Sequence, residues 1–321
     1  MLDELERALL GRPELRRLAG LHHHGIAGRL LGWRTHRLEH TLGVWSIVVA
    51  VAPEDRTLRV AALLHDVGHA PYSHALEGLP GVDHHAALES VLGGPLGAVV
   101  EASGHDLERV RRLVDGSEAS PLRNREGILH ADHLDSFVRG ARLRGRVAID
   151  PEAVRTGVRA DGAHLAFAAE LAEALVAAIA DEAAFQLEPL DVGSEAWLTE
   201  LVGTLVADGA LDPAALTSMS DADLDARLLT HPGTRGAFEA LLPSGGSWRA
   251  GAAEATDPTG TDGATDRVWT RIKRARYLPV PRRDGPEPDG WRVRLDAAYA
   301  PYRRDRTVVA RHAAVCGPSP G

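Results

Sequence analysis

The sequence predicts a mainly α-helical fold that carries one small β-hairpin and a basic C-terminal extension. Of the 321 residues, 44% are hydrophobic but only 4% are aromatic, so the core must consist largely of Ala, Leu and Val. Long Ala/Leu/Glu/Arg tracts favour helix. Apolar residues recur at helical spacing in 38–52 and again in 57–65. The exception is 153–167, where short apolar runs flank a turn signal.

The predicted elements are separated by clear breaks. Pro53 ends the first long helix, and Pro80-Gly81 marks a loop before a later one. Asp161-Gly162 is a turn signal between the apolar residues of the predicted hairpin. Ser220 and the acidic residues after it predict the N-terminal cap of another helix. Further helices are expected at 84–93, 105–114, 122–142 and 168–184.

Composition and charge predict three parts along the chain. Residues 1–242 form the main domain, 243–266 are rich in Gly, Ser, Thr and Asp and predict a flexible linker, and 267–321 form the basic extension. The extension has 13 Arg or Lys against 5 Asp or Glu, whereas the whole chain has a net charge of −9. The extension is therefore expected either to dock on the acidic main domain or to reach phosphate groups on a ligand.

The sequence indicates a cytoplasmic protein without a membrane segment. Cys316 is the only cysteine, which excludes an internal disulfide and fits a reducing compartment. The first residues are acidic, where a signal peptide would be basic and then apolar. No apolar stretch approaches 18 residues without a charge, so we expect no transmembrane helix and no membrane partner.

One short segment carries most of the functional information. Residues 65–74 read His-Asp-Val-Gly-His-Ala-Pro-Tyr-Ser-His and follow the apolar run 60–64, which predicts the end of a buried helix. Buried charges and imidazoles are costly unless something pairs with them. Ten of the 16 histidines lie between residues 22 and 85. A divalent cation bound by this part of the chain is the simplest explanation.

The order of these motifs resembles that of the HD-domain phosphohydrolases. The segment 37–44, Arg-Leu-Glu-His-Thr-Leu-Gly-Val, resembles the opening motif of the family, and His65-Asp66 resembles the doublet that names it. The longer match through His74, together with 130–139 and 220–229, is similar to the branch that contains the deoxynucleoside triphosphate triphosphohydrolases. The resemblance implies a helical HD-domain fold over residues 1–242.

The resemblance also implies roles for particular residues. It implies one divalent metal ion, and the donor types suit Mn, Fe, Mg, Zn, Co or Ni. The implied metal ligands are His40, His65, Asp66 and Asp132. The residues implied in acid–base chemistry and phosphate contact are His69, His74, Glu77 and His85, with His84 as an adjacent alternative to His85. Arg37, one helical turn before His40, is suited to grip phosphate.

The sequence departs from that branch in the pocket for the sugar. His23-His24 replaces a Gln-Leu pair, His133 replaces a basic residue, and Ser136 replaces a tyrosine. Since a hydrogen-bonding pocket built for one sugar discriminates against others, His23, His133 and Ser136 predict a changed substrate. A nucleoside monophosphate or an unusual nucleotide is therefore favoured over an ordinary deoxynucleoside triphosphate.

Three alternatives remain open from the sequence. The protein could be a deoxynucleoside triphosphate triphosphohydrolase, a two-iron oxygenase in which His85 and His105 hold a second ion, or a non-catalytic nucleotide-binding regulator. The expected partner in each hydrolase hypothesis is a small-molecule nucleotide, and nucleic acid is not expected. The branch often self-associates, so a homo-oligomer is also an expectation.

Overall fold

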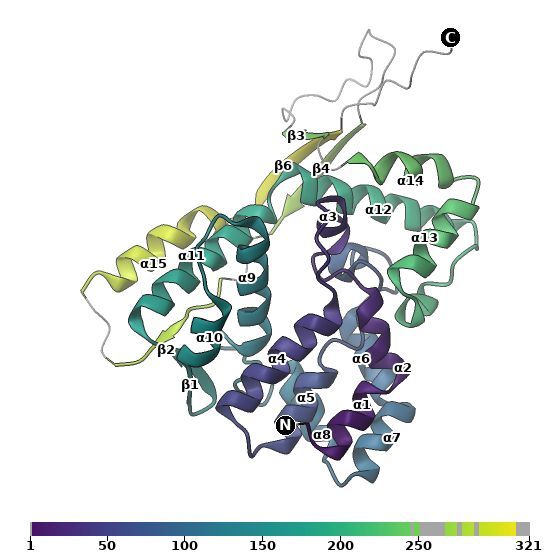
Figure 1. Cartoon of the computed structure of the whole chain (residues 1–321). Helices are drawn as coiled ribbons and strands as arrows, with labels where there is room; N and C mark the ends of the chain where they lie inside the picture. The colour runs from purple at the N-terminus through teal and green to yellow at the C-terminus, as the bar shows by residue number, and fades with distance from the viewer. Residues whose placement is uncertain (1, 245–246, 251–266, 275–277, 286–288, 313–321) are drawn as a thin grey trace.

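The computed structural model describes residues 2–244, 247–250, 267–274, 278–285 and 289–312. It is mainly α-helical with short strands, as the sequence predicts (Figure 1). The helices of the N-terminal part are α1 (Glu4–Leu10), α2 (Pro13–Arg16), η1 (Arg17–Gly20), α3 (Gly25–Leu30), α4 (Arg37–Val51), α5 (Arg56–Leu64), η2 (Ser73–Leu76), α6 (His84–Leu92), α7 (Pro95–Ala102) and α8 (Leu107–Asp115).

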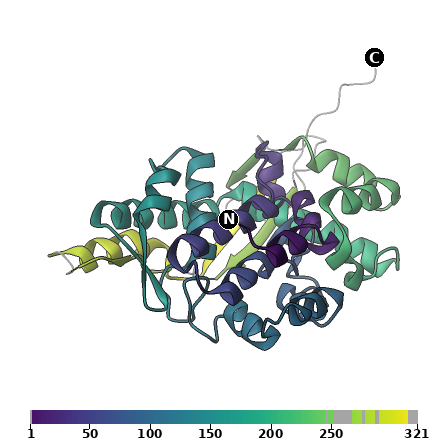
Figure 2. The same ribbon diagram turned by 60° about the horizontal axis from the view of Figure 1, so that its bottom comes forward.

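Helices continue through the rest of the main domain and return once in the extension. They are α9 (Ala131–Arg144), α10 (Pro151–Gly157), α11 (Ala169–Phe185), α12 (Pro189–Ala207), η3 (Pro213–Ser218), α13 (Asp221–Thr230), α14 (Arg235–Leu241), α15 (Trp291–Tyr299) and η5 (Ala300–Tyr302). Both α15 and the pair α13–α14 lie at the periphery, at opposite ends of the molecule, in the two views of Figures 1 and 2.

Two large groups of buried apolar side chains hold these helices together. The first lies among α1, α4, α5, α8, α9, α11 and α15. The second lies among α3, η2, α12, α13 and α14. Helix α5 lies inside the first core, since the five residues 60–64 at its C-terminal end are all buried. Its start is fixed by Asp55, whose carboxylate accepts a hydrogen bond from the amide of Leu58.

The predicted hairpin is present and carries one further strand, but residues 153–157 of the prediction are the end of α10, which Asp150 caps. Strands β1 (Val158–Asp161) and β2 (His164–Phe167) are antiparallel, and Gly162 takes a positive φ of 60° in the two-residue turn between them. Strand β5 (Arg282–Arg283), from the extension, adds to β2 in parallel. Part of the extension therefore joins the main domain by backbone hydrogen bonds.

The predicted helix at 122–142 is wrong in its first nine residues. Helix α9 begins at Ala131, and the side-chain oxygen of Asn124 accepts hydrogen bonds from the amides of Glu126 and Ile128. The side-chain amide nitrogen of Asn124 donates to the backbone carbonyl of Ile128. An Asn side chain that bonds to the nearby backbone offers it an alternative to helix, and here the alternative wins.

Two other strands of the extension form a second sheet on α12 together with one strand from the predicted linker. Its strand order is β3 (Trp248–Ala250), β6 (Arg306–His312) and β4 (Arg267–Lys273), with both pairings antiparallel. Residues 248–250 of the predicted linker are thus a strand, whereas 251–266 lie outside the described residues. The division into three domains stays a prediction.

The extension makes ion pairs with acidic side chains of the main domain. Lys273 lies 2.7 Å from Glu195 on α12, and Arg294 lies 2.7 Å from Glu173 on α11.

Among the described residues, no helix combines the length and apolarity needed to cross a membrane.

Candidate metal centre and active site

The predicted site residues surround a cavity of about 550 Å³ that lies between the two cores. Its walls come from the start of α3, from α4, from the segment after α5, and from α6, α9, α11, α12 and β4. Histidine is the commonest lining residue. The imidazoles are those of His23, His24, His40, His65, His69, His74, His84 and His133.

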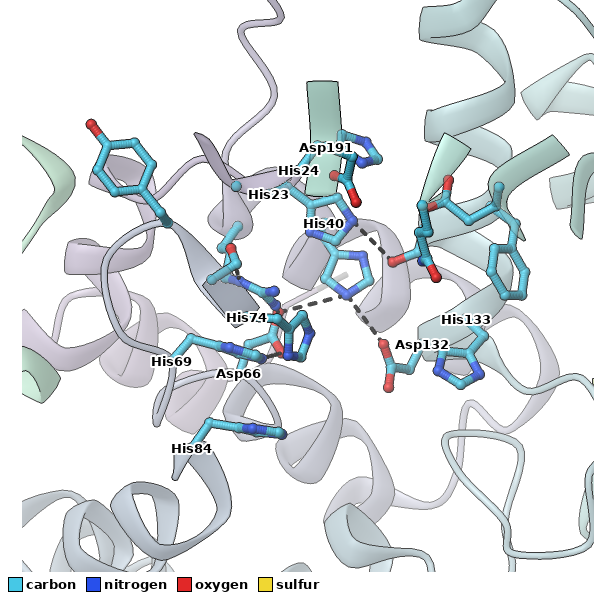
Figure 3. Close-up of a pocket in the computed structure, with 18 of the residues that line it drawn as sticks. His23, His24, His40, Asp66, His69, His74, His84, Asp132, His133 and Asp191 are labelled. Carbon is cyan, nitrogen blue, oxygen red and sulfur yellow. Dashed lines mark hydrogen bonds and ion pairs between the residues drawn. The ribbon is translucent and has the colours of Figure 1, made fainter. Parts of the chain in front are cut away.

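The four side chains predicted as metal ligands converge in this cavity, and Figure 3 labels His40, Asp66 and Asp132 among them. Nε2 of His40 lies 3.3 Å from Oδ1 of Asp132, 3.3 Å from Nε2 of His65 and 3.6 Å from Oδ2 of Asp66. Nε2 of His65 lies 3.5 Å from Oδ1 of Asp66. These separations are close to those between neighbouring ligands of one cation, and two imidazoles with two carboxylates suit a divalent transition metal.

The imidazole rings of this cluster are held by their other nitrogen atoms. Nδ1 of His40 lies 2.8 Å from Oδ2 of Asp135, and Nδ1 of His65 lies 2.9 Å from the carbonyl oxygen of Ala62. Each acceptor fixes a proton on Nδ1 and so leaves Nε2 facing the cluster, which is the arrangement found around metal-binding histidines. The residues therefore fit a divalent ion.

The carboxylate of Asp66 joins this cluster to the phosphate-gripping residue predicted from the sequence. Arg37 is buried, and its guanidinium donates to Oδ2 of Asp66 at 2.7 Å and to the hydroxyl of Ser73 at 2.7 Å. Burial raises the pKa of Asp66, but the charge of Arg37 and the imidazole of His65 more than offset this and hold it well below its usual range. Asp66 is therefore a carboxylate.

The neighbouring carboxylates give His40 an unusual protonation equilibrium. Burial lowers the pKa of His40, yet the hydrogen bonds with Asp132 and Asp135 outweigh burial and raise the pKa from 6.5 to about 9. A cation that binds at Nε2 must displace a proton in this range.

The metal-free protein is accordingly expected to lose stability as the pH rises. Since the pKa of His40 is higher in the folded state than its ordinary value of 6.5, its stabilising effect is complete below pH 6.5 and disappears as the pH passes through about 9. Metal affinity should increase over the same window. Thermal melting of chelator-treated protein from pH 6 to 10, with metal titrations in parallel, measures both. Equal pH dependence in His40→Gln would contradict the assignment.

A second group of side chains lies beside the first and contains the predicted acid–base residues. Nδ1 of His74 lies 2.7 Å and Nδ1 of His84 lies 2.5 Å from Oε1 of Glu77. His69 stacks on His84 with ring centroids 4.6 Å apart, and its Nε2 lies 3.1 Å from Oδ1 of Asp66. Partial burial raises the pKa of Glu77, but the hydrogen bonds and charges of the two imidazoles outweigh burial and lower the pKa below its ordinary value. Glu77 is therefore ionised.

His84, rather than the predicted His85, lines this cavity. His85 lies in a neighbouring cavity, which shares Arg123 and His133 with the first. The close packing of α6 places His84 here. A Cβ atom on Gly68 would lie 2.3 Å from the carbonyl oxygen of His84 and 2.6 Å from the amide nitrogen of Leu88, so the glycine allows the contact.

The residues predicted to change the sugar pocket lie close together in the same cavity. Nε2 of His23 lies 2.9 Å from the hydroxyl of Ser136, and its ring stacks on His40 with centroids 4.2 Å apart. Burial lowers the pKa of His24 and of His133 to about 4 and lowers that of His23 well below its ordinary value. These three imidazoles are therefore neutral near pH 7.

Several residues in or beside the cavity are not among the predicted site residues. Asp135, which orients His40, lies three positions after Asp132 on α9, and this spacing alone indicates one helix face. Lys273 reaches the cavity from β4, and Arg123 reaches it from the loop before α9. The sequence offered little for these two beyond the fact that Lys273 is the only lysine.

The second ligand set of the two-iron hypothesis is not assembled. His105 hydrogen-bonds to Thr57 at 3.2 Å, and Thr57 lies at the opposite end of α5 from His65. Neither His85 nor His105 lines the cavity of the metal cluster.

Comparison with known proteins agrees with this geometry. Residues 37–94 match the HD domain family. A metal-dependent phosphohydrolase of Cordyceps militaris is 28% identical over 269 residues, which cover 74% of this chain and 72% of that protein. An uncharacterized protein of Methanocaldococcus jannaschii is 37% identical over 81 residues, and the match spans only 18% of its length.

Solved structures share the fold over nearly the whole chain. A hypothetical protein of Aquifex aeolicus has a TM-score of 0.66 at 15% identity, covering 98% of this chain and 93% of its own. A phosphohydrolase of Bacteroides thetaiotaomicron has a TM-score of 0.65 at 15% identity, covering 99% and 96%. Residues 37–94 therefore carry an HD domain, and the similarities support a metal-dependent phosphohydrolase.

Proposed function

We propose that the protein hydrolyses a phosphate ester or anhydride of a nucleotide or nucleotide-like substrate, with a nucleoside monophosphate or an unusual nucleotide favoured over an ordinary deoxynucleoside triphosphate. The observation that carries the proposal is the convergence of His40, His65, Asp66 and Asp132 beside a second group of titratable side chains. Membership of the deoxynucleoside triphosphate triphosphohydrolase branch stays a prediction.

The four converging side chains are the proposed ligands of the metal. A bound divalent ion polarises a phosphoryl group and lowers the pKa of water. The protein's own contribution is to fix the ligand atoms in advance. Asp135 and the carbonyl of Ala62 hold the two imidazoles, and Arg37 holds Asp66.

The second group is the proposed source of protons for the leaving oxygen. Because Glu77 accepts from Nδ1 of both His74 and His84, each ring keeps its Nε2 for the substrate. Imidazole is the side chain that most often transfers a proton in such a position. His69 lies between this group and Asp66 and is proposed to contact the phosphate.

Replacing His84 and His85 separately should give very different results. His84→Ala removes a lining imidazole that pairs with Glu77, and loss of a general acid typically costs about 100-fold or more in turnover. His85→Ala changes the adjacent residue, which lies outside this cavity, and should cost less than about threefold. Phosphate release at saturating substrate, with metal content measured on both variants, checks the pair. Equal losses would contradict the role of His84.

The charges around the cavity favour a substrate with few phosphates. The lining cations with a permanent charge are Arg37, Arg123 and Lys273, whereas five carboxylates line the same space, namely Asp66, Asp132, Glu182, Asp191 and Glu195. Arg37 and Lys273 are moreover paired with three of those carboxylates. A bound divalent ion would offset the two carboxylates proposed as its ligands, so the lining would have no excess of positive charge to balance a triphosphate.

The neutral imidazoles support a changed specificity. His23 and Ser136 already hydrogen-bond to each other, so a sugar hydroxyl that binds here must fit that pair. A site that hydrogen-bonds one hydroxyl pattern rejects analogues lacking it. The rings of Phe137 and Phe185 in the same wall provide apolar surface for a base.

A substrate screen tests the proposal. The purified protein is incubated with nucleoside mono-, di- and triphosphates in the ribo and deoxy series, each with Mn, Mg, Co, Ni, Fe or Zn. Separate readings of phosphate, pyrophosphate and triphosphate identify the bond that is cleaved. Preferential release of phosphate from monophosphates is expected. Binding without turnover under every metal would favour a regulator, and oxygen consumption with about two irons per chain would favour an oxygenase.

A further inference from the structure

The segment that carries the acid–base residues contains a strained turn. Tyr72 and Ser73 have positive φ angles of 57° and 61°, although neither is glycine. Such angles are unfavourable for residues with a Cβ atom and persist only where surrounding contacts hold them. The turn lies between the metal ligands His65 and Asp66 and the proposed acid–base residue His74, so its shape sets where His74 lies.

The carboxylate of Asp221 makes the contact that holds this turn. Asp221 is buried at the start of α13, about 150 positions later in the chain, and its Oδ1 accepts the backbone amide of Tyr72 at 2.7 Å. Its Oδ2 accepts the backbone amide of His22 at 2.8 Å and lies 2.7 Å from Nδ1 of the same residue. One side chain therefore joins two walls of the cavity.

The network from Asp221 continues to the metal cluster. The carbonyl of His22 accepts the hydroxyl of Ser73 at 2.7 Å, and the same hydroxyl accepts a hydrogen bond from Arg37, which in turn holds Asp66. Displacement of the turn would thus change the position of Arg37 as well as that of His74.

Two further contacts hold the same segment from α13 and from η1. The hydroxyl of Tyr72 donates to Asp225, one helical turn after Asp221, at 2.6 Å. The guanidinium of Arg17 donates to the carbonyls of Val67 and His69 at 3.0 and 2.8 Å. The segment between the metal ligands and His74 is fixed at both ends.

We infer that Asp221 is a positioning residue, which holds the strained Tyr72–Ser73 turn so that His74 and Arg37 keep their places beside the metal cluster. The inference rests on the proposed function for its effect on turnover. Its effect on the backbone can be measured without any substrate.

Asp221→Ala is expected to loosen the turn and slow catalysis. Hydrogen exchange at the amides of residues 72–76 and 22–24 should become at least about tenfold faster, and kcat should fall at least about tenfold with a smaller change in KM. Asp221→Asn keeps an amide oxygen for Tyr72 and should restore part of both. Metal content should stay unchanged, because Asp221 is not a proposed ligand.

Asp223→Ala is the matched control. Asp223 lies in the same first turn of α13 and accepts from Ser220 in the helix cap, without a contact to residues 65–76. The Asp223→Ala variant should have a lower stability but an unchanged rate of hydrogen exchange at the amides of residues 72–76. Wild-type exchange at 72–76 in Asp221→Ala would overturn the inference whether or not a substrate is known. Fast exchange with no phosphohydrolase activity in the wild type would overturn the proposed function and leave the positioning role supported.

A double-mutant cycle tests the role of strain. Tyr72→Gly keeps the amide but removes the penalty of the positive φ, so Asp221→Ala should affect exchange much less in this background than in wild type. Tyr72→Phe removes only the hydroxyl and should leave the effect of Asp221→Ala unchanged. The same effect of Asp221→Ala in all three backgrounds would mean that strain is not what Asp221 opposes.

Discussion

Asp66→Asn is expected to reduce the rate of phosphate release about 1000-fold or more. Asp66 contributes a carboxylate to the proposed metal cluster. Loss of the metal's charge stabilisation would raise the activation free energy by several kcal/mol. The same change leaves the buried Arg37 guanidinium without its anionic partner, which costs about 3 kcal/mol of folding free energy. Bound metal, phosphate release and thermal unfolding are measured together.

Asp181→Asn separates the two effects. Asp181 is also a carboxylate paired with a well-buried arginine, at 2.5 Å from Arg144, but it does not line the cavity. It should lower the unfolding temperature by less than Asp66→Asn, because Arg144 keeps Glu182 at 2.7 Å, and it should leave metal content and turnover unchanged. If Asp66→Asn kept wild-type turnover, the metal centre would lie elsewhere and the hydrolase proposal would fail with it.

Gly193→Ala should cause a large loss of stability outside the metal centre. A Cβ atom on this residue of α12 would lie 2.0 Å from the ring of Trp248 and 2.8 Å from the Cβ of Ala310, so the C-terminal sheet must move away from the helix. Overpacking of this kind costs about 3 kcal/mol. Urea unfolding followed by tryptophan fluorescence measures the loss, because Trp248 packs against Trp197 and Trp269.

Gly203→Ala on the same helix should have the opposite sign. There the new Cβ would meet only Leu79 at 3.6 Å, an ordinary contact. Alanine favours helix over glycine by about 1 kcal/mol, so a small gain in stability is expected. A loss at Gly193 no larger than the change at Gly203 would contradict the predicted clash with Trp248.

Local signals in the sequence predicted the elements that depend on local contacts. The period of apolar residues gave α4 and α5, and Asp161-Gly162 gave the turn of the hairpin. The helix predicted over 122–130 is wrong because the side chain of Asn124 accepts hydrogen bonds from the backbone amides of Glu126 and Ile128, which a helix would use differently. A pattern of apolar residues carries no information about that competition.

The order of the motifs predicted the residues of the metal cluster but not the residues that surround it. The spacing of Asp132 and Asp135 could have predicted Asp135, since the two residues share a face of one helix. The choice of His84 over His85 depends on how α6 packs against Gly68, which is a tertiary contact. Asp221 and Lys273 enter the site from far along the chain, and only the fold shows that they do.

The place of Lys273 in the cavity wall bears on how the protein can be shortened. A fragment that ends at the predicted boundary, residue 242, would keep every proposed metal ligand and lose β4 with its ammonium group. It would also uncover the face of α12 on which the tryptophan cluster packs. Truncation or fusion designs should therefore retain the chain through β6, since residues as far apart in the sequence as His23 and Lys273 line the same cavity.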